Sequence, residues 1–360
     1  MGAARGGRPS ALKRFSSFLT FACCVSALAF ASCGGAGPRG PLAYVTNERD
    51  GTVSVIDTAT DRVVETWRLG GRPRGVRVSG DGRTVYVALS TPSGKDYDPK
   101  ENHVAAVEAA TGRVVARHEV GTDPEQLAVL PDGSRLYASN EDAGTATVLD
   151  LKTGRPPAAL VVGIEPEGVT ASPDGRWVYV TAETSNTVTV IDTRAEAVAA
   201  AFMVDARPRD AAFSPDGARA YVTTEIGRTL VVVNAATHEV VRSVPVPNNA
   251  AGVKPMGVVV SPDGRRVYVS TGRGRTVVVF DAETLGVVAE IPVGQRAWGL
   301  GLTPDGRKLY VACGGSDAGS SGANEVTVID TAALRAVAAL RAGDGPWGIA
   351  VGHQAADAGR

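Results

Sequence analysis

Residues 166–192 read PEGVTASPDGRWVYVTAETSNTVTVID, and this stretch decides the fold. Short runs rich in Val, Thr, Tyr and Ala, separated by turn residues, occupy positions 168–172, 177–181, 187–191 and, less regularly, 197–204. Runs of this length and composition are typical of β-strands. The Ser-Pro-Asp-Gly sequence at 172–175 suits a tight turn, because Pro presets φ, Asp accepts backbone hydrogen bonds and Gly tolerates a left-handed conformation. The stretch therefore predicts a unit of four short strands.

The same unit recurs along the chain. Its most constant residue is a tyrosine inside the second run, found at Tyr44, Tyr86, Tyr137, Tyr179, Tyr221, Tyr268 and Tyr310. Uninterrupted neighbours such as Tyr137 and Tyr179 are 42 residues apart. Four strands in a repeat of this length are the signature of a propeller blade. The sequence therefore predicts an all-β fold, a seven-bladed β-propeller of four-stranded antiparallel blades.

The two ends of the repeat region complement each other. The chain enters the pattern at Tyr44, in a second strand, and ends with residues 346–351, which match a first strand that has nothing after it. We predict that the C-terminal strand completes the N-terminal blade, because this closure hides two sheet edges that would otherwise promote aggregation. The predicted propeller spans residues 42–352, and a disordered tail follows at 353–360.

The first 33 residues are typical of an export signal. An uncharged apolar stretch at 18–31 follows four basic residues, Arg5, Arg8, Lys13 and Arg14. This stretch is too short to be a permanent membrane span. Residues 31–33 resemble a bacterial lipobox, which predicts lipidation of Cys33, whereas residues 29–31 also fit ordinary signal cleavage. We expect an exported protein, periplasmic or anchored to a membrane through an N-terminal lipid, with residues 34–41 as a flexible tether.

Charge and cysteine usage exclude several classes of protein. The chain has 37 Lys and Arg against 38 Asp and Glu, a balance that argues against nucleic-acid binding. Cys23 and Cys24 leave with the signal, so Cys313 has no intramolecular partner and a disulfide framework is excluded. No haem-attachment, zinc, nucleophile-elbow or phosphate-loop motif occurs. We expect a monomer with no catalytic residue, no metal and no cofactor.

Several motifs carry a family resemblance that spans residues 42–351. YVTN at 44–47, TVSVID at 52–57, GIEPEG at 163–168 and SPDG at 172–175 look like the YVTN-repeat β-propeller family. The order of the loop motifs RPRG, DPE, EPEG, RPR and GPWG, which begin at residues 72, 123, 165, 207 and 345, is most similar to the pyrroloquinoline quinone-dependent catabolism-associated β-propeller proteins. Ala297 departs from this pattern, since it stands where a loop proline is expected.

Three insertions interrupt the regular spacing, and all are predicted to lie on one face of the disc. Two lengthen connections between second and third strands, by 9 residues after Tyr86 and by 7 after Tyr310. The third adds 5 residues to the connection between Asn234 and the next blade. In an antiparallel blade these two types of connection emerge on the same side. We assign function to this insertion-bearing face, because long loops on a rigid scaffold are where binding concentrates.

The residue after each loop proline, or after Ala297, is predicted to ring the channel mouth on the insertion-bearing face. In order around the ring these are Trp347, Arg74, Glu125, Glu167, Arg209, Met256 and Trp298. Glu125 and Glu167, flanked by the two arginines, either hold a cation or polar ligand or form an ion-paired ring, which we favour. Trp298 and Trp347 meet where the ring closes, and they either bind a planar ligand or partner, or cap the core.

Two further acidic sets have simple interpretations. Carboxylates four residues after a repeat tyrosine, at Glu48, Glu141, Glu183 and Glu225, are expected to be solvated loop charges. Aspartates that end the third runs, at Asp57, Asp150, Asp192, Asp281 and Asp330, are expected to cap turns. The charged loop at 90–103 is either a partner clamp or a mobile solvated loop.

The leading hypothesis is a non-catalytic exported propeller that binds a protein partner or small ligand on the insertion-bearing face. The resemblance implies a supporting role in periplasmic oxidation of alcohols or similar compounds, with a periplasmic dehydrogenase or cytochrome as the partner. Two alternatives stay open. One is a propeller enzyme of the lactonase or lyase type with a carboxylate or metal site at the channel mouth, and the other is a structural or adhesion protein of the cell surface.

Overall fold

The computed structural model describes residues 40–91, 98, 101–247, 252–315 and 324–352. The chain divides into Met1–Gly37, which lies outside these residues, and the propeller unit Pro38–Arg360. The predictions for the signal segment, the lipidated Cys33, most of the tether and the tail at 353–360 therefore fall outside the described residues. So does the middle of the charged loop at 90–103. The described residues form strands, turns and bends, and they include no helical segment with the length and apolarity of a membrane span.

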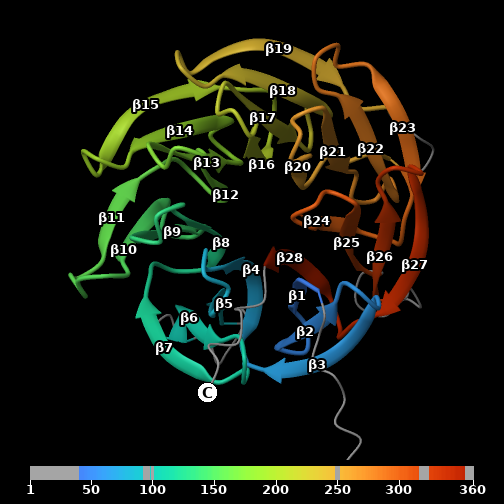
Figure 1. Ribbon diagram of the computed structural model, residues 1–360. Coiled ribbons are helices and arrows are strands. Elements are labelled where there is room, and N and C mark those ends of the chain that lie inside the picture. Colours follow the sequence, from blue (N-terminus) through green and yellow to red (C-terminus); the bar gives the residue numbers. More distant parts are fainter. Residues whose placement is uncertain (1–39, 92–97, 99–100, 248–251, 316–323, 353–360) are drawn as a thin grey trace, which may run out of the picture. The chain divides into compact units, whose positions relative to one another are not determined.

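Seven four-stranded antiparallel sheets surround a central channel, as predicted (Figure 1). We number the blades along the chain, and we name the four strands of each blade in order from the channel outward. Blade 1 contains β28 (Pro346–Gly352), β1 (Leu42–Asn47), β2 (Thr52–Asp57) and β3 (Arg62–Arg68). Blade 2 contains β4 (Arg72–Val78), β5 (Thr84–Ser90), β6 (His103–Glu108) and β7 (Val114–Glu119), and blade 3 contains β8 (Pro124–Val129), β9 (Arg135–Asn140), β10 (Thr145–Asp150) and β11 (Ala158–Val161).

Blade 4 contains β12 (Pro166–Ala171), β13 (Trp177–Ala182), β14 (Thr187–Asp192) and β15 (Ala197–Met203). Blade 5 contains β16 (Pro208–Phe213), β17 (Arg219–Thr224), β18 (Thr229–Asn234) and β19 (Glu239–Pro245). Blade 6 contains β20 (Val258–Val260), β21 (Arg266–Ser270), β22 (Thr276–Asp281) and β23 (Val287–Pro292). Blade 7 contains β24 (Ala297–Leu302), β25 (Lys308–Gly314), β26 (Asn324–Asp330) and β27 (Arg335–Arg341).

The core lies between the blades. Buried apolar side chains form seven clusters, and each joins two neighbouring blades. The second and third strands are buried on both faces, whereas the outermost strands are mostly exposed, as in β3 and β19. This explains why Val and Ile stand next to each other in the inner runs rather than alternating with polar residues. No blade has a core of its own, so the ring is stable only when it is complete.

The ring closes through the C-terminal strand, as predicted. β28 pairs antiparallel with β1, and Tyr44 lies opposite Ala350. A cluster that includes Val45, Tyr310 and Ile349 fills the interface between blades 7 and 1. The closure also has polar contacts, since Tyr310 donates a hydrogen bond to Asp61 and Lys308 Nζ lies 2.7 Å from Asp61 Oδ2. Blade 1 is thus built from both ends of the propeller and held by the same interactions as the other interfaces.

The innermost strands approach each other at backbone distance. In five interfaces a hydroxyl two residues after the repeat tyrosine donates to the carbonyl of the next blade's ring residue, as Thr46 does to Arg74 O at 2.6 Å. In five interfaces a glycine faces that same carbonyl, and a Cβ there would lie 2.4–2.6 Å from the oxygen at Gly75, Gly168, Gly257, Gly299 and Gly348. This close approach fixes where each ring residue sits.

The strand ends that flank the three insertions all lie on the predicted common face, because the blades are antiparallel. They are the ends of β5 and β6, of β25 and β26, and of β19 and β20, and the inserted residues 92–97, 99–100, 248–251 and 316–323 lie outside the described residues. The opposite face carries short turns. Ser172 Oγ donates to Asp174 at 2.5 Å, and Gly175 has a φ of 70°. The predicted aspartate caps are confirmed, since Asp150 Oδ1 accepts from the backbone of Lys152 and Thr153 at 2.9 and 2.8 Å.

Candidate functional site

Three positions of each blade lie at the channel mouth of the insertion-bearing face. They are the residue before the loop proline or Ala297, the residue after it, and the fourth residue beyond the repeat tyrosine, and in blades 1, 6 and 7 one of the three is a glycine. A backbone hydrogen bond often joins the first and third, as from Glu141 N to Asp123 O at 2.9 Å and from Glu183 N to Glu165 O at 2.8 Å. These positions therefore recur at fixed places, and the residue types that fill them decide the chemistry of the mouth.

The residue types divide the mouth into sectors. Blade 2 contributes two arginines, Arg72 and Arg74. Blade 3 contributes three acids, Asp123, Glu125 and Glu141, and blade 4 also contributes three, Glu165, Glu167 and Glu183. Blade 5 contributes two arginines and one acid, Arg207, Arg209 and Glu225. Blades 6, 7 and 1 contribute Lys254, Met256, Arg296, Trp298, Trp347 and Glu48. An acidic sector is thus flanked by arginines and faces an aromatic and basic one.

The backbone at the mouth is strained. The residue before the loop proline or Ala297 has a left-handed φ of 49° at Asp123, 54° at Glu165, 61° at Arg207 and 52° at Arg296. In blade 1 the same position is Gly345, with a φ of 72°. A side chain in this conformation costs about 1–2 kcal/mol relative to glycine. Four charged residues are therefore held at the mouth despite this local cost.

Arg209 organises the ion pairs of blades 4 and 5. It is 7% exposed, contacts Glu183, and places Nη2 3.0 Å from Glu167 Oε1. Arg207 lies 2.5 Å from Glu183 Oε2 and 3.0 Å from Glu225 Oε2. Lys254 Nζ lies 2.5 Å from Glu225 Oε1. Hydrogen bonding and charge from Lys254 and the arginines lower the pKa of Glu225 although burial opposes this shift.

Blades 2 and 3 form a second charged group. Arg74 pairs with Glu125, and its Nε lies 3.4 Å from Glu48 Oε2. Arg72 lies 3.7 Å from Asp123 and 3.9 Å from Glu48. Glu125 is fully buried, and burial raises its pKa well above the usual range despite the arginine. Burial likewise raises the pKa of Glu167.

The aromatic residues stack at the ring closure. The rings of Trp298 and Trp347 are 6.0 Å apart between centroids and inclined by 28°. Arg74 lies over Trp347 at 5.3 Å, and Arg209 and Arg296 lie over Trp298 at 5.2 and 5.4 Å. Each cation–π contact contributes about 0.5–2 kcal/mol. These contacts link the two tryptophans to Arg74 of blade 2 and to Arg209 of blade 5.

These ion pairs and ring contacts join six of the seven predicted ring residues, namely Arg74, Glu125, Glu167, Arg209, Trp298 and Trp347. Met256 is buried, and it shares a small cavity of about 30 Å³ with Glu167, Arg209, Trp298 and Trp347. The two interpretations of Glu125 and Glu167 both retain a basis, because each carboxylate pairs with an arginine and both are buried. The expectation that the second acidic set is solvated is wrong for Glu183 and Glu225, which are buried and ion-paired. The spacing located these carboxylates but did not show the arginines of the adjoining blade.

Sequence reasoning missed the basic cavity, which is a hollow of about 160 Å³ beside Trp298. Its lining consists of Arg207, Arg209, Glu225, Lys254, Met256, Gly272, Arg273, Arg296 and Trp298. Three of its cations, Arg207, Lys254 and Arg296, precede a loop proline or Ala297. The repeat could have revealed them, had its period been applied to the position before the proline as well as the position after it.

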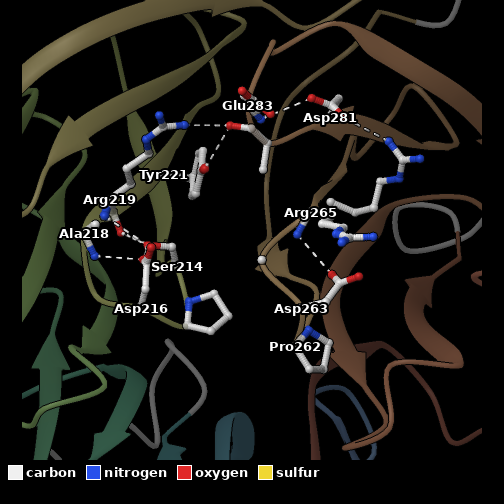
Figure 2. A pocket seen from close by; sticks show the side chains of 14 residues that line it. Ser214, Asp216, Ala218, Arg219, Tyr221, Pro262, Asp263, Arg265, Asp281 and Glu283 are labelled. Atoms are coloured by element: carbon white, nitrogen blue, oxygen red, sulfur yellow. Dashed lines mark hydrogen bonds and ion pairs between the residues drawn. The ribbon is translucent and has the colours of Figure 1, made fainter.

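A larger cavity, about 800 Å³, lies on the opposite face between the turns of blades 5 and 6 (Figure 2). Its polar groups mostly satisfy one another. Arg219 Nη1 donates to Ala282 O at 2.8 Å, and Asp263 Oδ1 accepts from Arg265 N at 3.0 Å (Figure 2). The Asp263 contact is a turn contact that recurs in other blades, for example at Asp174 and Asp305. The groove is therefore a gap between regular turns, and we place the candidate site at the mouth.

The histidines and the cysteine in the described part of the chain lie in strands and turns of the blades. His238 Nδ1 lies 2.6 Å from the hydroxyl of Tyr179, across an interface between blades. Cys313 is buried, and burial raises its thiol pKa to about 12. A thiol with this pKa is not a nucleophile at neutral pH. His103 and His118 lie on β6 and β7 in the outer half of blade 2.

Comparisons with known proteins agree with the fold. The family model described as "Lactonase, 7-bladed beta-propeller" matches residues 196–321. The "Uncharacterized protein YncE" of Salmonella typhi and of Salmonella typhimurium is 39% identical over 56 residues, a match that spans only 16% of this chain and 16% of those relatives.

Solved structures match over most of the chain. A candidate 6-phosphogluconolactonase of Bacteroides uniformis has a TM-score of 0.70 at 19% identity and covers 87% of this chain and 100% of its own. Hydrazine synthase of Kuenenia stuttgartiensis has a TM-score of 0.66 at 23% identity, with 77% of this chain and 89% of its own covered. Dihydro-heme d1 dehydrogenase NirN has a TM-score of 0.60 at 18% identity and covers 86% and 74%. These likenesses concern the fold alone, and with the ring of blades they identify the chain as a seven-bladed β-propeller protein.

Proposed function

We propose that the protein binds a small organic anion in the basic cavity and releases it unchanged. The observation that carries this proposal is the lining of the cavity, which has five cationic side chains and one carboxylate. Opposite charge in a partly enclosed site attracts and orients an anion much more strongly than it would in bulk water.

The carboxylates at or beside the cavity have cationic partners. Glu167 and Glu183 pair with the two arginines of blade 5, and Glu225 pairs with Lys254. Charge and hydrogen bonding from these cations lower the pKa of Glu225, against the effect of burial. The lining of the cavity itself carries five cationic side chains and one carboxylate, so it favours an anion over a cation.

The size and walls of the cavity favour an organic ligand of modest size. A volume of about 160 Å³ equals that of about five water molecules at about 30 Å³ each. Met256 and Trp298 supply an apolar wall beside the cations. We therefore expect a carboxylate or phosphate group on a short or monocyclic apolar body.

The carboxylates at this cavity support binding rather than catalysis. A general base must be free to take a proton and have a pKa near the working pH. Glu225 has a lowered pKa and contacts three cations, and Glu183 contacts two arginines. Neither group meets those requirements.

A lactonase is the second candidate, and two observations favour it. The lactonase family model matches residues 196–321, and burial raises the pKa of Glu167 at the channel. Hydrolysis of a panel of lactones by the wild type, abolished in Glu167→Gln, would support this candidate over the first. Turnover that is equal in both proteins, or absent, would oppose it.

The cellular role is a further part of the proposal. Based on the signal-like segment and the motif resemblance, we propose that Cys33 carries a lipid outside the cytoplasm and that the bound anion belongs to quinoprotein-dependent oxidation. Metabolic labelling with palmitate tests the first point, with Cys33→Ala as the control. Growth of a deletion strain on alcohols tests the second, and unimpaired growth would contradict it.

Binding itself is tested by calorimetry with benzoate, gluconate and inorganic phosphate, and with methyl benzoate as the uncharged control. We expect at least one anion to bind and methyl benzoate to fail. Arg296→Gln removes one charge-assisted contact worth about 1.5–3 kcal/mol and should weaken binding by about 10- to 150-fold. Arg265→Gln on the opposite face is the matched control and should bind normally. Absence of any anion binding, or an equal loss in both variants, would refute the proposal.

A further inference from the structure

The acidic residues of blade 3 form a compact group of oxygen atoms. Asp123 precedes the loop proline, Glu125 follows it, and Glu141 lies at the end of β9. One carboxylate oxygen from each lies within 4.8 Å of the other two. Two oxygens bound to one Ca²⁺ at about 2.4 Å are at most about 4.8 Å apart, so a single ion can contact all three residues.

A second observation is independent of this clustering. The Glu125 side chain is fully buried, and only its Oε2 contacts Arg74. Glu125 Oε1 is buried and accepts no hydrogen bond from the described residues. Asp123 Oδ1 is also buried and accepts no hydrogen bond from them, although Arg72 Nη1 lies 3.7 Å away. A buried carboxylate oxygen without a donor is a costly arrangement that a bound cation would relieve.

The local charge points the same way. Glu48, Asp123 and Glu125 share two guanidinium groups, those of Arg72 and Arg74, and Glu141 adds a fourth carboxylate. With all four carboxylates ionised the formal charge of this group is about −2, which one divalent cation neutralises.

The ion-paired group of blades 4 and 5 provides an internal comparison. There Glu167, Glu183 and Glu225 meet Arg207, Arg209 and Lys254. Glu165, which occupies the position of Asp123, accepts a hydrogen bond from Thr184 Oγ1 at 2.5 Å. The same three positions thus carry acids in both blades, but the formal negative charge left over is larger at blade 3, about −2 against −1.

We propose that Asp123, Glu125 and Glu141 bind a calcium ion at the channel mouth. Ca²⁺ suits the site because its ligands are carboxylate oxygens from two loops and a strand, and Ca²⁺ accepts irregular geometry where Mg²⁺ demands a near-ideal octahedron. The ion joins the connection before blade 3 to the connection after β9 and thereby holds Glu125 in place at the mouth. This site is separate from the basic cavity.

The test uses the full propeller after treatment with EDTA. Calorimetry with CaCl₂ and sensitised Tb³⁺ luminescence measure binding, and thermal melting with and without CaCl₂ measures linkage to folding. We expect a Kd of about 10⁻⁴ to 10⁻³ M, the usual range for extracellular calcium modules, with weaker binding of Mg²⁺. Ca²⁺ should displace Tb³⁺ and raise the melting temperature.

Two variants make the result decisive. Glu141→Gln removes a partly exposed ligand and should weaken Ca²⁺ at least 10-fold, while its melting temperature in EDTA stays close to that of the wild type. Glu165→Gln, at the position in blade 4 that corresponds to Asp123, is the control and should keep wild-type affinity. No heat and no displaceable Tb³⁺ signal up to 10⁻² M Ca²⁺ would overturn the proposal, as would an equal loss of affinity in both variants.

Discussion

The clearest structural prediction concerns Gly299 on β24. A Cβ at this position would lie 2.4 Å from Trp347 O and 3.1 Å from both Gly348 Cα and Ile349 N. All three are backbone atoms of β28, so no side chain can rotate away. Gly299→Ala therefore forces the innermost strands of blades 7 and 1 apart by several tenths of an ångström.

The expected cost is about 3 kcal/mol, at the upper end of the range for overpacking, because backbone rather than side chain must move. Urea unfolding followed by tryptophan fluorescence measures this cost, and it should lower the melting temperature by several degrees. Gly286→Ala is the matched control. Its Cβ would meet only Thr284 Oγ1 at 3.4 Å, so the change should be close to neutral.

A free energy of unfolding for Gly299→Ala within about 0.5 kcal/mol of the wild type would refute the reasoning. It would show that the inner strands are not packed backbone against backbone. The position of the Trp298–Trp347 stack, and of the whole mouth, would then lose its structural basis.

Four further predictions follow from other contacts. Truncation after residue 345 removes β28 and exposes the edge of β1, so the protein should aggregate or melt far below the full chain in a thermal scan. Glu183→Gln breaks the buried contacts with Arg207 and Arg209 and should cost about 3–5 kcal/mol in urea unfolding, whereas a loss below 1 kcal/mol would mean that the pairs are solvated. Backbone hydrogen bonds lower the pKa of Asp150 to about 2. The stability that the Asp150 carboxylate confers is therefore complete above its ordinary pKa and is lost as the pH falls through about 2. NMR titration measures this pKa, and a value near its ordinary one of about 4 would contradict the cap. Arg275 has a φ of 58° in an exposed turn, so Arg275→Gly should leave stability unchanged or raise it by up to about 1 kcal/mol, and a loss of 1 kcal/mol would show that its side chain matters.

The blades, the ring closure and the common face of the insertions could be predicted from the sequence because each depends on spacing along the chain. A tyrosine in every repeat, and an SPDG or similar turn in most of them, fix the strands. The phase of the repeat at Tyr44 and at residue 346 fixes the closure. Predicting these features does not require knowing which side chains contact one another.

The partners at the mouth could not be predicted in the same way. Glu183 is predicted to be a solvated loop charge because loop carboxylates are usually exposed, yet Arg207 and Arg209 reach it from the next blade. Arg74 likewise crosses an interface to Glu125, 51 residues away. Burial of these charges follows from how closely the inner strands approach, which the repeat period does not encode.

The most direct test of the central claim, that the basic sector of the mouth binds an organic anion, is anomalous diffraction from crystals soaked in 4-bromobenzoate. The account predicts a bromine peak in the basic cavity beside Trp298, with the carboxylate turned toward Arg296 or Lys254. A peak instead in the groove between the turns of blades 5 and 6 (Figure 2), with none at the mouth, would contradict it.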